Sequence, residues 1–261
     1  MDVDELVRGW RVEETGPAEG WDFSALEGRV EEPELPWDFD AVTREGLAGA
    51  RAVLDMGTGG GERLLRFREL LPPDTTATEG WEPNIPVARK ALTAYGIQVV
   101  AFGQPDDDPR PAPMPFPDER FDLVLNRHES YHPQEIARVL TPGGLFLTQQ
   151  VSGDEFAEVR EAFGVPAPAA HVHYAPFREA LTEAGLEVLD GAESVDHYTF
   201  KDIGALVAYL QLVPWDAPED FTVDRYTDAL LALHAKGTPL QVTRKRFWLK
   251  AQRNVRVASQ K

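Results

Sequence analysis

The chain has 261 residues, of which 43% are hydrophobic and 27% charged, so it is long enough for one large α/β domain with an accessory element. Acidic residues outnumber basic ones by 44 to 26, and the net charge of −18 disfavours broad binding to nucleic acids and to anionic membranes. The chain contains no cysteine, which excludes disulfides, thiolate metal sites and a cysteine nucleophile.

The chain start and the hydropathy pattern bear on localisation. Residues 1–9 are acidic and lack the apolar core of a secretory signal. No uninterrupted apolar run reaches the roughly 18 residues that a membrane-spanning helix needs. We therefore expect a cytoplasmic protein that makes no use of a membrane.

The first 40 residues differ in composition from the rest of the chain. They are rich in tryptophan, acidic residues and proline, and they show no sustained helical or strand period beyond the first turns. We interpret residues 1–40 as an N-terminal arm and residues 41–261 as the main domain.

From residue 39 onward, helical and extended patterns alternate. Helices are predicted at 39–47, 62–71, 85–95 and 133–140, and strands at 51–56, 75–78, 98–102, 121–125 and 145–151. Further along we expect helices at 176–184, 203–212 and 226–235, and strands at 186–189, 194–200 and 243–252. Such alternation predicts an α/β fold with a doubly wound, mostly parallel seven-stranded sheet, helices on both faces, and a helical cap at 195–240.

A glycine-rich turn follows the first predicted strand. Asp55 lies near the end of that strand, and Gly57, Gly59 and Gly61 follow at alternate positions. Glycines there permit positive φ angles and let a ligand approach the backbone closely. A turn of this kind taken alone is equally consistent with simple packing. No Walker lysine follows it, which disfavours a P-loop.

Glu79 ends the second predicted strand, 18 residues after Gly61 and near the spacing of about 20 residues at which an acid reaches ribose hydroxyls in dinucleotide folds. Glu82 is an alternative, although its position at a helix start also fits an interaction with the helix dipole. Asp55 and Glu62 around the glycine turn would oppose a bound pyrophosphate. The pattern therefore favours a cationic or zwitterionic nucleoside ligand over a dinucleotide.

Four motifs together resemble the class I S-adenosylmethionine-dependent methyltransferases. The acid and spaced glycines at 55–61 are similar to the first motif of that family, and Glu79 stands where the family has its ribose-binding acid. Residues 114–124 (MPFPDERFDLV) resemble its LPF…FDLV run, and residues 138–144 (RVLTPGG) its R-x-L-x-P-G-G turn. The motifs follow the family order between residues 50 and 151. The resemblance implies a methyltransferase with S-adenosylmethionine as cofactor.

One position departs from the family pattern. The family usually has an acid after the third strand that receives the adenine amino group, whereas this chain has Gln104, with Asp106 to Asp108 as alternatives in an apparent insertion. Trp81 offers an apolar face for adenine, although a surface or core tryptophan fits equally well. The complete set of predicted cofactor-binding residues is Asp55, Gly57, Thr58, Gly59, Gly61, Glu79, Trp81, Gln104 and Asn126.

Residues 126–132 follow the fourth strand, where a methyl acceptor would approach, because ligands of open α/β sheets lie beyond the carboxyl ends of the strands. His128 is suited to take a proton near neutral pH, and Glu129 to orient it or to act as the base itself. The structural alternative is that His128 bonds loop backbone and Glu129 pairs with Arg127. We predict His128 and Glu129 as catalytic residues that serve the acceptor rather than the cofactor, with 195–240 as the acceptor-side cap.

Other polar clusters allow further interpretations. His171, His173 and His197 have spacings that a metal site can use, but loop or core roles are more common, and we predict no metal. The basic run at 244–246 either contacts RNA or forms an exposed charged edge of the last strand. Residues 148–151 (TQQV) resemble uncharacterised bacterial members of the family and indicate no substrate.

The sequence therefore predicts a methyltransferase for a small-molecule acceptor, without a nucleic acid partner. Two alternatives stay open: an RNA methyltransferase that uses the basic run, and a cofactor-binding regulatory protein without turnover.

Overall fold

The computed structural model describes residues 2–14, 24–104, 112–167, 170–213 and 216–255. The chain divides into two compact units. The core unit comprises residues 36–151, 172–193 and 246–261, and the accessory unit comprises residues 1–35, 152–171 and 194–245. The glycine turn, Glu79 and residues 126–132 all belong to the core unit.

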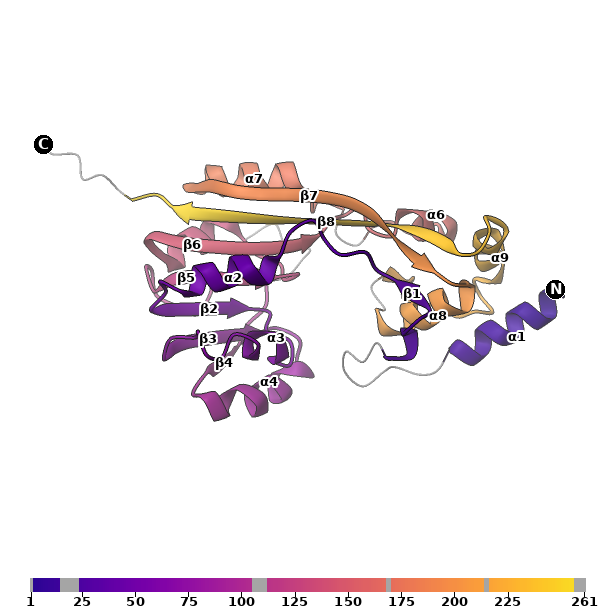
Figure 1. Cartoon of the computed structure of the whole chain (residues 1–261), viewed down its shortest axis with the longest axis horizontal. Helices are drawn as coiled ribbons and strands as arrows, with labels where there is room; N and C mark the ends of the chain where they lie inside the picture. The colour runs from indigo at the N-terminus through magenta and orange to yellow at the C-terminus, as the bar shows by residue number, and fades with distance from the viewer. Residues whose placement is uncertain (1, 15–23, 105–111, 168–169, 214–215, 256–261) are drawn as a thin grey trace, which may run out of the picture. The chain divides into compact units, whose positions relative to one another are not determined.

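The strands of the described residues form one sheet. They are β1 (Val30–Glu31), β2 (Ala52–Met56), β3 (Asp74–Glu79), β4 (Gln98–Ala101), β5 (Phe121–Arg127), β6 (Leu140–Val151), β7 (Leu186–Phe200) and β8 (Leu240–Arg253). Their order is β1-β7-β8-β6-β5-β2-β3-β4 (Figure 1). The pairs among β2, β3, β4, β5 and β6 are parallel, whereas β8 runs antiparallel to β6 and β1 to β7.

The predicted α/β class and mostly parallel sheet are thus confirmed, but the described sheet has eight strands rather than seven. The additional strand is β1, in the segment that we interpreted as an arm, where Val30 and Glu31 pair with Phe200 and Thr199. Two residues are too few to produce a recognisable alternation of polar and apolar side chains, so the sequence did not indicate this strand.

The core unit contains the helices α2 (Phe39–Leu47), α3 (Glu62–Leu65), α4 (Asn84–Leu92), α5 (Pro133–Val139) and α7 (Tyr174–Glu183), and the 3-10 turn η2 (Thr93–Tyr95). α2 has the predicted bounds, because the Asp38 carboxylate accepts a hydrogen bond from the Ala41 N–H at 2.9 Å and caps its start. α3 is shorter than the predicted helix at 62–71. The N–H groups of Arg66 and Phe67 bond back three residues instead of four, which ends the α-helix in tighter turns.

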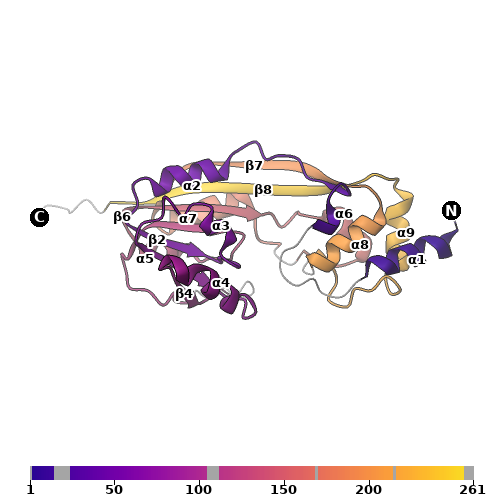
Figure 2. The ribbon, with the colours of Figure 1, turned by 60° about the horizontal axis from the view of Figure 1, so that its bottom comes forward.

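Alternate residues of the central strands join different apolar clusters, as the two-residue period of a strand requires. Leu54 and Met56 of β2 pack in a cluster with side chains of α5 and α7, whereas Val53 packs in a cluster with side chains of α2, α3 and α4. Figures 1 and 2 show α4 beside β3 and β4. This packing fixes the ends of β2, β3 and β5, from which the candidate site is built.

The accessory unit contains α1 (Val3–Glu13), the 3-10 turn η1 (Ser24–Leu26), α6 (Ala157–Phe163), α8 (Ile203–Leu212) and α9 (Thr227–Ala235). These elements share one apolar core with Tyr198, Phe200 and Tyr209, so most of the aromatic side chains at 198–226 are ordinary core residues. The sequence analysis missed α1, because only Val7 and Trp10 of its eleven residues are buried. Residues 3–13 of the interpreted arm are therefore helical, and the helix packs on this core through those two side chains.

The basic run at 244–246 is covered rather than exposed. It lies on β8, which has β7 on one side and β6 on the other. Arg244 is only 4% exposed, and its guanidinium donates to the Pro33 oxygen and forms ion pairs with Glu32 and Asp196. Arg246 is also buried. The prediction of an exposed charged edge is wrong, because neighbouring strands and acidic partners cover the run, and the feature that favoured RNA binding is lost with it.

None of the helices in the described ranges is both long and apolar enough to cross a bilayer. The same ranges contain no group of three or more histidine or acidic side chains placed to hold a metal ion, and His171, His173 and His197 do not form one.

Candidate functional site

The glycine turn after β2 has the backbone that the sequence predicted. Gly57, Gly59 and Gly61 have φ angles of 61°, 63° and 90°, in the left-handed region that favours glycine. A Cβ on Gly61 would lie 2.8 Å from Leu92 of α4, whereas nothing lies within 4 Å of the Cβ position of Gly59. The turn is therefore packed closely at Gly61 and has open space at Gly59.

Glu79 at the end of β3 is joined to this turn. Its side chain is 4% exposed, its Oε2 accepts a hydrogen bond from the Gly59 N–H at 2.7 Å, and its Oε1 accepts one from the Trp81 N–H at 2.8 Å. Each carboxylate oxygen retains a second lone pair for a ligand. Glu82, the alternative acid, is exposed. The structure thus brings Glu79, rather than Glu82, to the glycine turn.

Asp55, near the end of β2, is shielded from solvent. Burial raises the pKa of its carboxyl group to about 6, although a hydrogen bond with Thr58 and the nearby Arg63 guanidinium act in the opposite direction. The folded chain therefore retains the Asp55 proton to a higher pH than the unfolded chain does, since an aspartate in water has a pKa of about 4.

This difference predicts a pH-dependent stability. As the pH rises from about 4 to about 6, Asp55 ionises in the unfolded chain before the folded one, and the folded state loses stability. The free energy of unfolding of Asp55→Asn should therefore increase relative to that of the wild type across this window and keep a constant difference above it. Urea unfolding at a series of pH values measures the difference, and one that does not vary with pH would contradict the burial of an ionisable Asp55.

The loops after β3 and β4 touch each other through their backbones. A Cβ on Gly80 would lie 2.7 Å from the Cα of Gly103. Gln104 follows and is 8% exposed, and its amide oxygen accepts a hydrogen bond from the Ala112 N–H at 3.1 Å, within its own loop. Trp81 is 58% exposed, so it has the open ring face that stacking requires. Asp106 to Asp108 lie outside the described residues.

Asn126, predicted to bind the cofactor, makes hydrogen bonds to other residues of the protein. It is 1% exposed, its Oδ1 accepts hydrogen bonds from the Thr148 hydroxyl and the Gln150 amide, and its Nδ2 donates to the main-chain oxygen of Glu129 at 3.0 Å. Gln150 donates to the same oxygen at 3.1 Å. This buried network therefore holds the main chain at Glu129.

The Glu129 side chain lies against the glycine turn. A Cβ on Gly57 would meet Oε2 of Glu129 at 2.6 Å, and a Cβ on Gly103 would meet its Oε1 at 3.3 Å. The carboxylate thus lies between the loops that follow β2 and β4. The predicted catalytic Glu129 thus lies beside the predicted cofactor turn, and its service to the acceptor rather than the cofactor stays a prediction.

His128 is the first residue after β5 and has a φ angle of 63°. Its main-chain N–H donates to the Gln149 oxygen at 2.9 Å, and its Nε2 lies 3.5 Å from Nε2 of Gln149. Gln149 is in turn bonded to the indole of Trp37. The sequence analysis did not assign a role to Trp37, Gln149 or Gln150. The sequence feature that could have indicated these roles is the TQQ run at 148–150, which places three polar residues on a strand expected to be buried.

The two remaining motifs that resemble the methyltransferase family, residues 114–124 and 138–144, contact each other at α5. The Arg138 guanidinium donates to the main-chain oxygens of Met114 and Phe116, and Glu135 accepts from the Met114 N–H at 2.6 Å. Hydrogen bonds from Arg138 hold the pKa of Glu135 below its usual range. The arginine of the RVLTPGG turn therefore fixes the loop that carries the MPF run.

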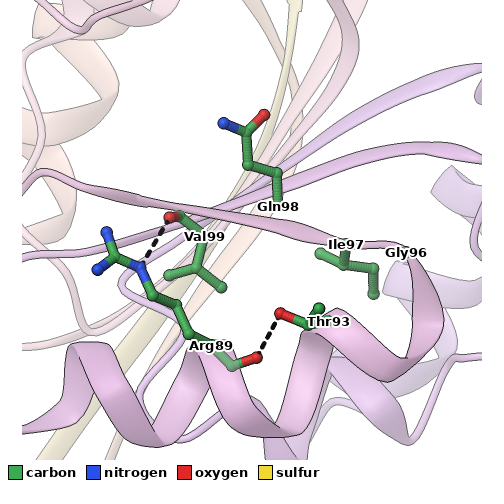
Figure 3. A pocket seen from close by; sticks show the side chains of 6 residues that line it. All are labelled: Arg89, Thr93, Gly96, Ile97, Gln98 and Val99. Atoms are coloured by element: carbon green, nitrogen blue, oxygen red, sulfur yellow. Dashed lines mark hydrogen bonds between the residues drawn. The ribbon is translucent and has the colours of Figure 1, made fainter.

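An open hollow of about 350 Å³ lies elsewhere on the core unit (Figure 3). Its lining comes from α4, the turn at Gly96 and the start of β4, and the Arg89 Nε–H donates to the Val99 oxygen beside it. The glycine turn, Glu79 and Glu129 lie instead at or beyond the ends of parallel strands, where ligands of such sheets bind. The hollow is therefore not part of the candidate site.

Comparison with known families agrees with this arrangement. Residues 54–148 match the family model described as "Methyltransferase domain". The predicted resemblance to the class I methyltransferases is thus confirmed, through a match over this segment of the chain.

The chain is also similar to individual methyltransferases. It is 29% identical over 147 residues to the fatty-acid O-methyltransferase of Mycolicibacterium smegmatis, an overlap of 53% of this chain and 45% of that protein. It is 29% identical over 205 residues to "Probable phthiotriol/phenolphthiotriol dimycocerosates methyltransferase 2" of Mycobacterium ulcerans, which covers 74% of this chain and 68% of that protein. The chain thus spans less than half of the length of the first relative.

Among solved structures, the YcgJ protein of Bacillus subtilis has a TM-score of 0.56 at 16% identity, covering 83% of this chain and 98% of that one. This likeness shows a shared fold.

Proposed function

We propose that the chain is an S-adenosylmethionine-dependent methyltransferase that acts on a small-molecule acceptor. The observation that carries the proposal is the buried Glu79 carboxylate, which is bonded to the Gly59 N–H beside open space. A carboxylate so placed can accept hydrogen bonds from two ribose hydroxyls. The acidic surroundings of Asp55, Glu79 and Glu129 suit a ligand with positively charged sulfonium and amino groups.

The residues present fit this cofactor. Those that would hold it are Asp55, Gly57, Thr58, Gly59, Gly61, Glu79 and Trp81. When bound, the cofactor supplies the methyl group and a good leaving group. The protein's own task is then to hold the acceptor in line with that methyl, which can contribute several kcal/mol to rate acceleration.

We assign acceptor activation to the segment after β5. The Glu129 carboxylate would take the proton that the acceptor oxygen or nitrogen gives up on receiving the methyl group, which the bound cofactor would supply. His128 contributes a hydrogen bond beside it. The role of residues 195–240 as an acceptor-side cap stays a prediction.

Cofactor binding gives the first test. We expect S-adenosylmethionine and S-adenosylhomocysteine to bind in the micromolar range, and NAD to bind far more weakly because acidic residues surround the place of its pyrophosphate. Isothermal titration calorimetry of the full chain measures all three ligands. Tight NAD binding without heat from either sulfur ligand would refute the proposal.

Turnover is the second test. The names of the two mycobacterial relatives refer to a fatty acid and to dimycocerosates. A panel of candidate acceptors should therefore include fatty acids and hydroxylated lipids as well as polar metabolites. Transfer of a labelled methyl group to a member of such a panel would support the proposal. Cofactor binding without transfer to any metabolite pool would favour the regulatory alternative.

A further inference from the structure

The side-chain amide of Gln149, on β6, has its orientation determined by Trp37. Gln149 is 3% exposed, and its Oε1 accepts a hydrogen bond from the indole Nε1–H of Trp37 at 3.0 Å. An indole nitrogen can only donate. The oxygen of the amide must therefore face Trp37, and the NH2 group must face away from it.

That NH2 group faces the ring of His128. The two Nε2 atoms lie 3.5 Å apart, at the outer limit of a hydrogen bond. The main chains also meet, since the His128 N–H donates to the Gln149 oxygen at 2.9 Å and Arg127 pairs with Gln149 in the parallel register. Gln149 therefore holds His128 at its backbone and at its ring.

The protonation of the ring follows from this contact. An amide NH2 group only donates, so Nε2 of His128 must act as the acceptor, and the neutral ring must carry its proton on Nδ1. A neutral ring without such a neighbour exchanges between its two tautomers.

We infer that Trp37 and Gln149 are positioning residues that hold His128 in the Nδ1–H tautomer. The Nε2 lone pair is then directed at Gln149, and the ring offers a hydrogen-bond donor at Nδ1 instead of a base at Nε2. Proton removal from the acceptor is left to Glu129. The catalytic part of this inference rests on the proposed function, whereas the tautomer is inferred from the contacts that join Trp37, Gln149 and His128.

Ring ¹⁵N chemical shifts of the full ¹⁵N-labelled chain test the tautomer directly, with the His128 signals identified through His128→Asn. At a pH where the ring is neutral, we expect Nδ1 to be protonated and Nε2 not. Gln149→Glu keeps the side-chain size and the acceptor for Trp37 but places a carboxylate oxygen against the ring, so the proton should move to Nε2. Trp37→Phe removes the donor that orients the amide, and the two tautomers should then mix.

Two exposed residues outside this arrangement provide matched controls. Gln98→Glu and Trp81→Phe repeat the same chemical changes and should leave the His128 shifts unaltered. A wild-type ring protonated at Nε2 would overturn the inference, as would a Gln149→Glu ring still protonated at Nδ1. If Gln149→Glu does not fold, unchanged His128 ring ¹⁵N shifts in Trp37→Phe would contradict the inference. The expected shifts in a chain that binds no cofactor would refute the proposed function and leave the tautomer established.

Discussion

Replacement of Glu129 by glutamine should lower methyl transfer by roughly 10²–10⁴-fold, the effect of losing a general base. The substitution removes the proposed proton acceptor but keeps the size of the side chain, because the amide has nearly the same volume and fills the same space beside Gly57 and Gly103. The affinity for S-adenosylhomocysteine should accordingly stay close to that of the wild type. Steady-state turnover and calorimetry on the same folded preparation measure both quantities.

The comparison variants separate a chemical role from a structural one. Glu82→Gln makes the same change at an exposed position of the same unit and should leave turnover unchanged. His128→Ala removes the ring that contacts Gln149, and it should also reduce turnover while leaving cofactor affinity nearly unchanged. If Glu129→Gln instead weakens S-adenosylhomocysteine binding as strongly as a change at Glu79, the carboxylate belongs to the cofactor site.

Glu79→Ala should weaken the binding of S-adenosylmethionine and S-adenosylhomocysteine by roughly 1.5–3 kcal/mol, the value of hydrogen bonds to a charged group. The change removes the acceptor for the ribose hydroxyls, and it also releases the N–H groups of Gly59 and Trp81 from the carboxylate. The glycine turn then loses its connection to the end of β3 through this side chain. Calorimetry on variants shown by circular dichroism to be folded measures the effect.

Glu82→Ala is the matched control for this position. It removes an exposed carboxylate only three residues further along the chain, so the binding of both ligands should change little. Equal losses in the two variants, or a larger loss in Glu82→Ala, would show that the ribose acid has been wrongly assigned.

The part of the candidate site around the glycine turn could be predicted from the sequence because its elements are local. Gly57, Gly59 and Gly61 need their positive φ angles within one short turn, and the strand before that turn is visible as an apolar run. Glu79 is recognisable in the same way, since it ends the next strand of a parallel sheet. Parallel strands end at a common edge, so the topology alone brings this acid to the turn.

The part of the candidate site that follows β5 depends on contacts between distant segments. Such contacts cannot be predicted from the spacing of polar and apolar residues. The polar residues of β6 were visible in the sequence, but only the parallel register of β5 and β6 places Gln149 beside His128 and Gln150 beside Asn126. The position of Glu129 beside Gly57 likewise joins the segment after β5 to the turn after β2.

The burial of the basic run at 244–246 was also decided by the tertiary structure. A basic run such as 244–246 is equally compatible with an edge strand and with an interior one, and the difference lies in the strands and acids that surround it. Here β6 and β7 flank β8, and Glu32 and Asp196 pair with Arg244. The sequence by itself therefore determined the class of the sheet and the glycine turn, because both follow from local patterns of residues. The neighbours of His128, Glu129 and Arg244 were decided only when the chain packed, because each of those contacts joins residues from separate elements.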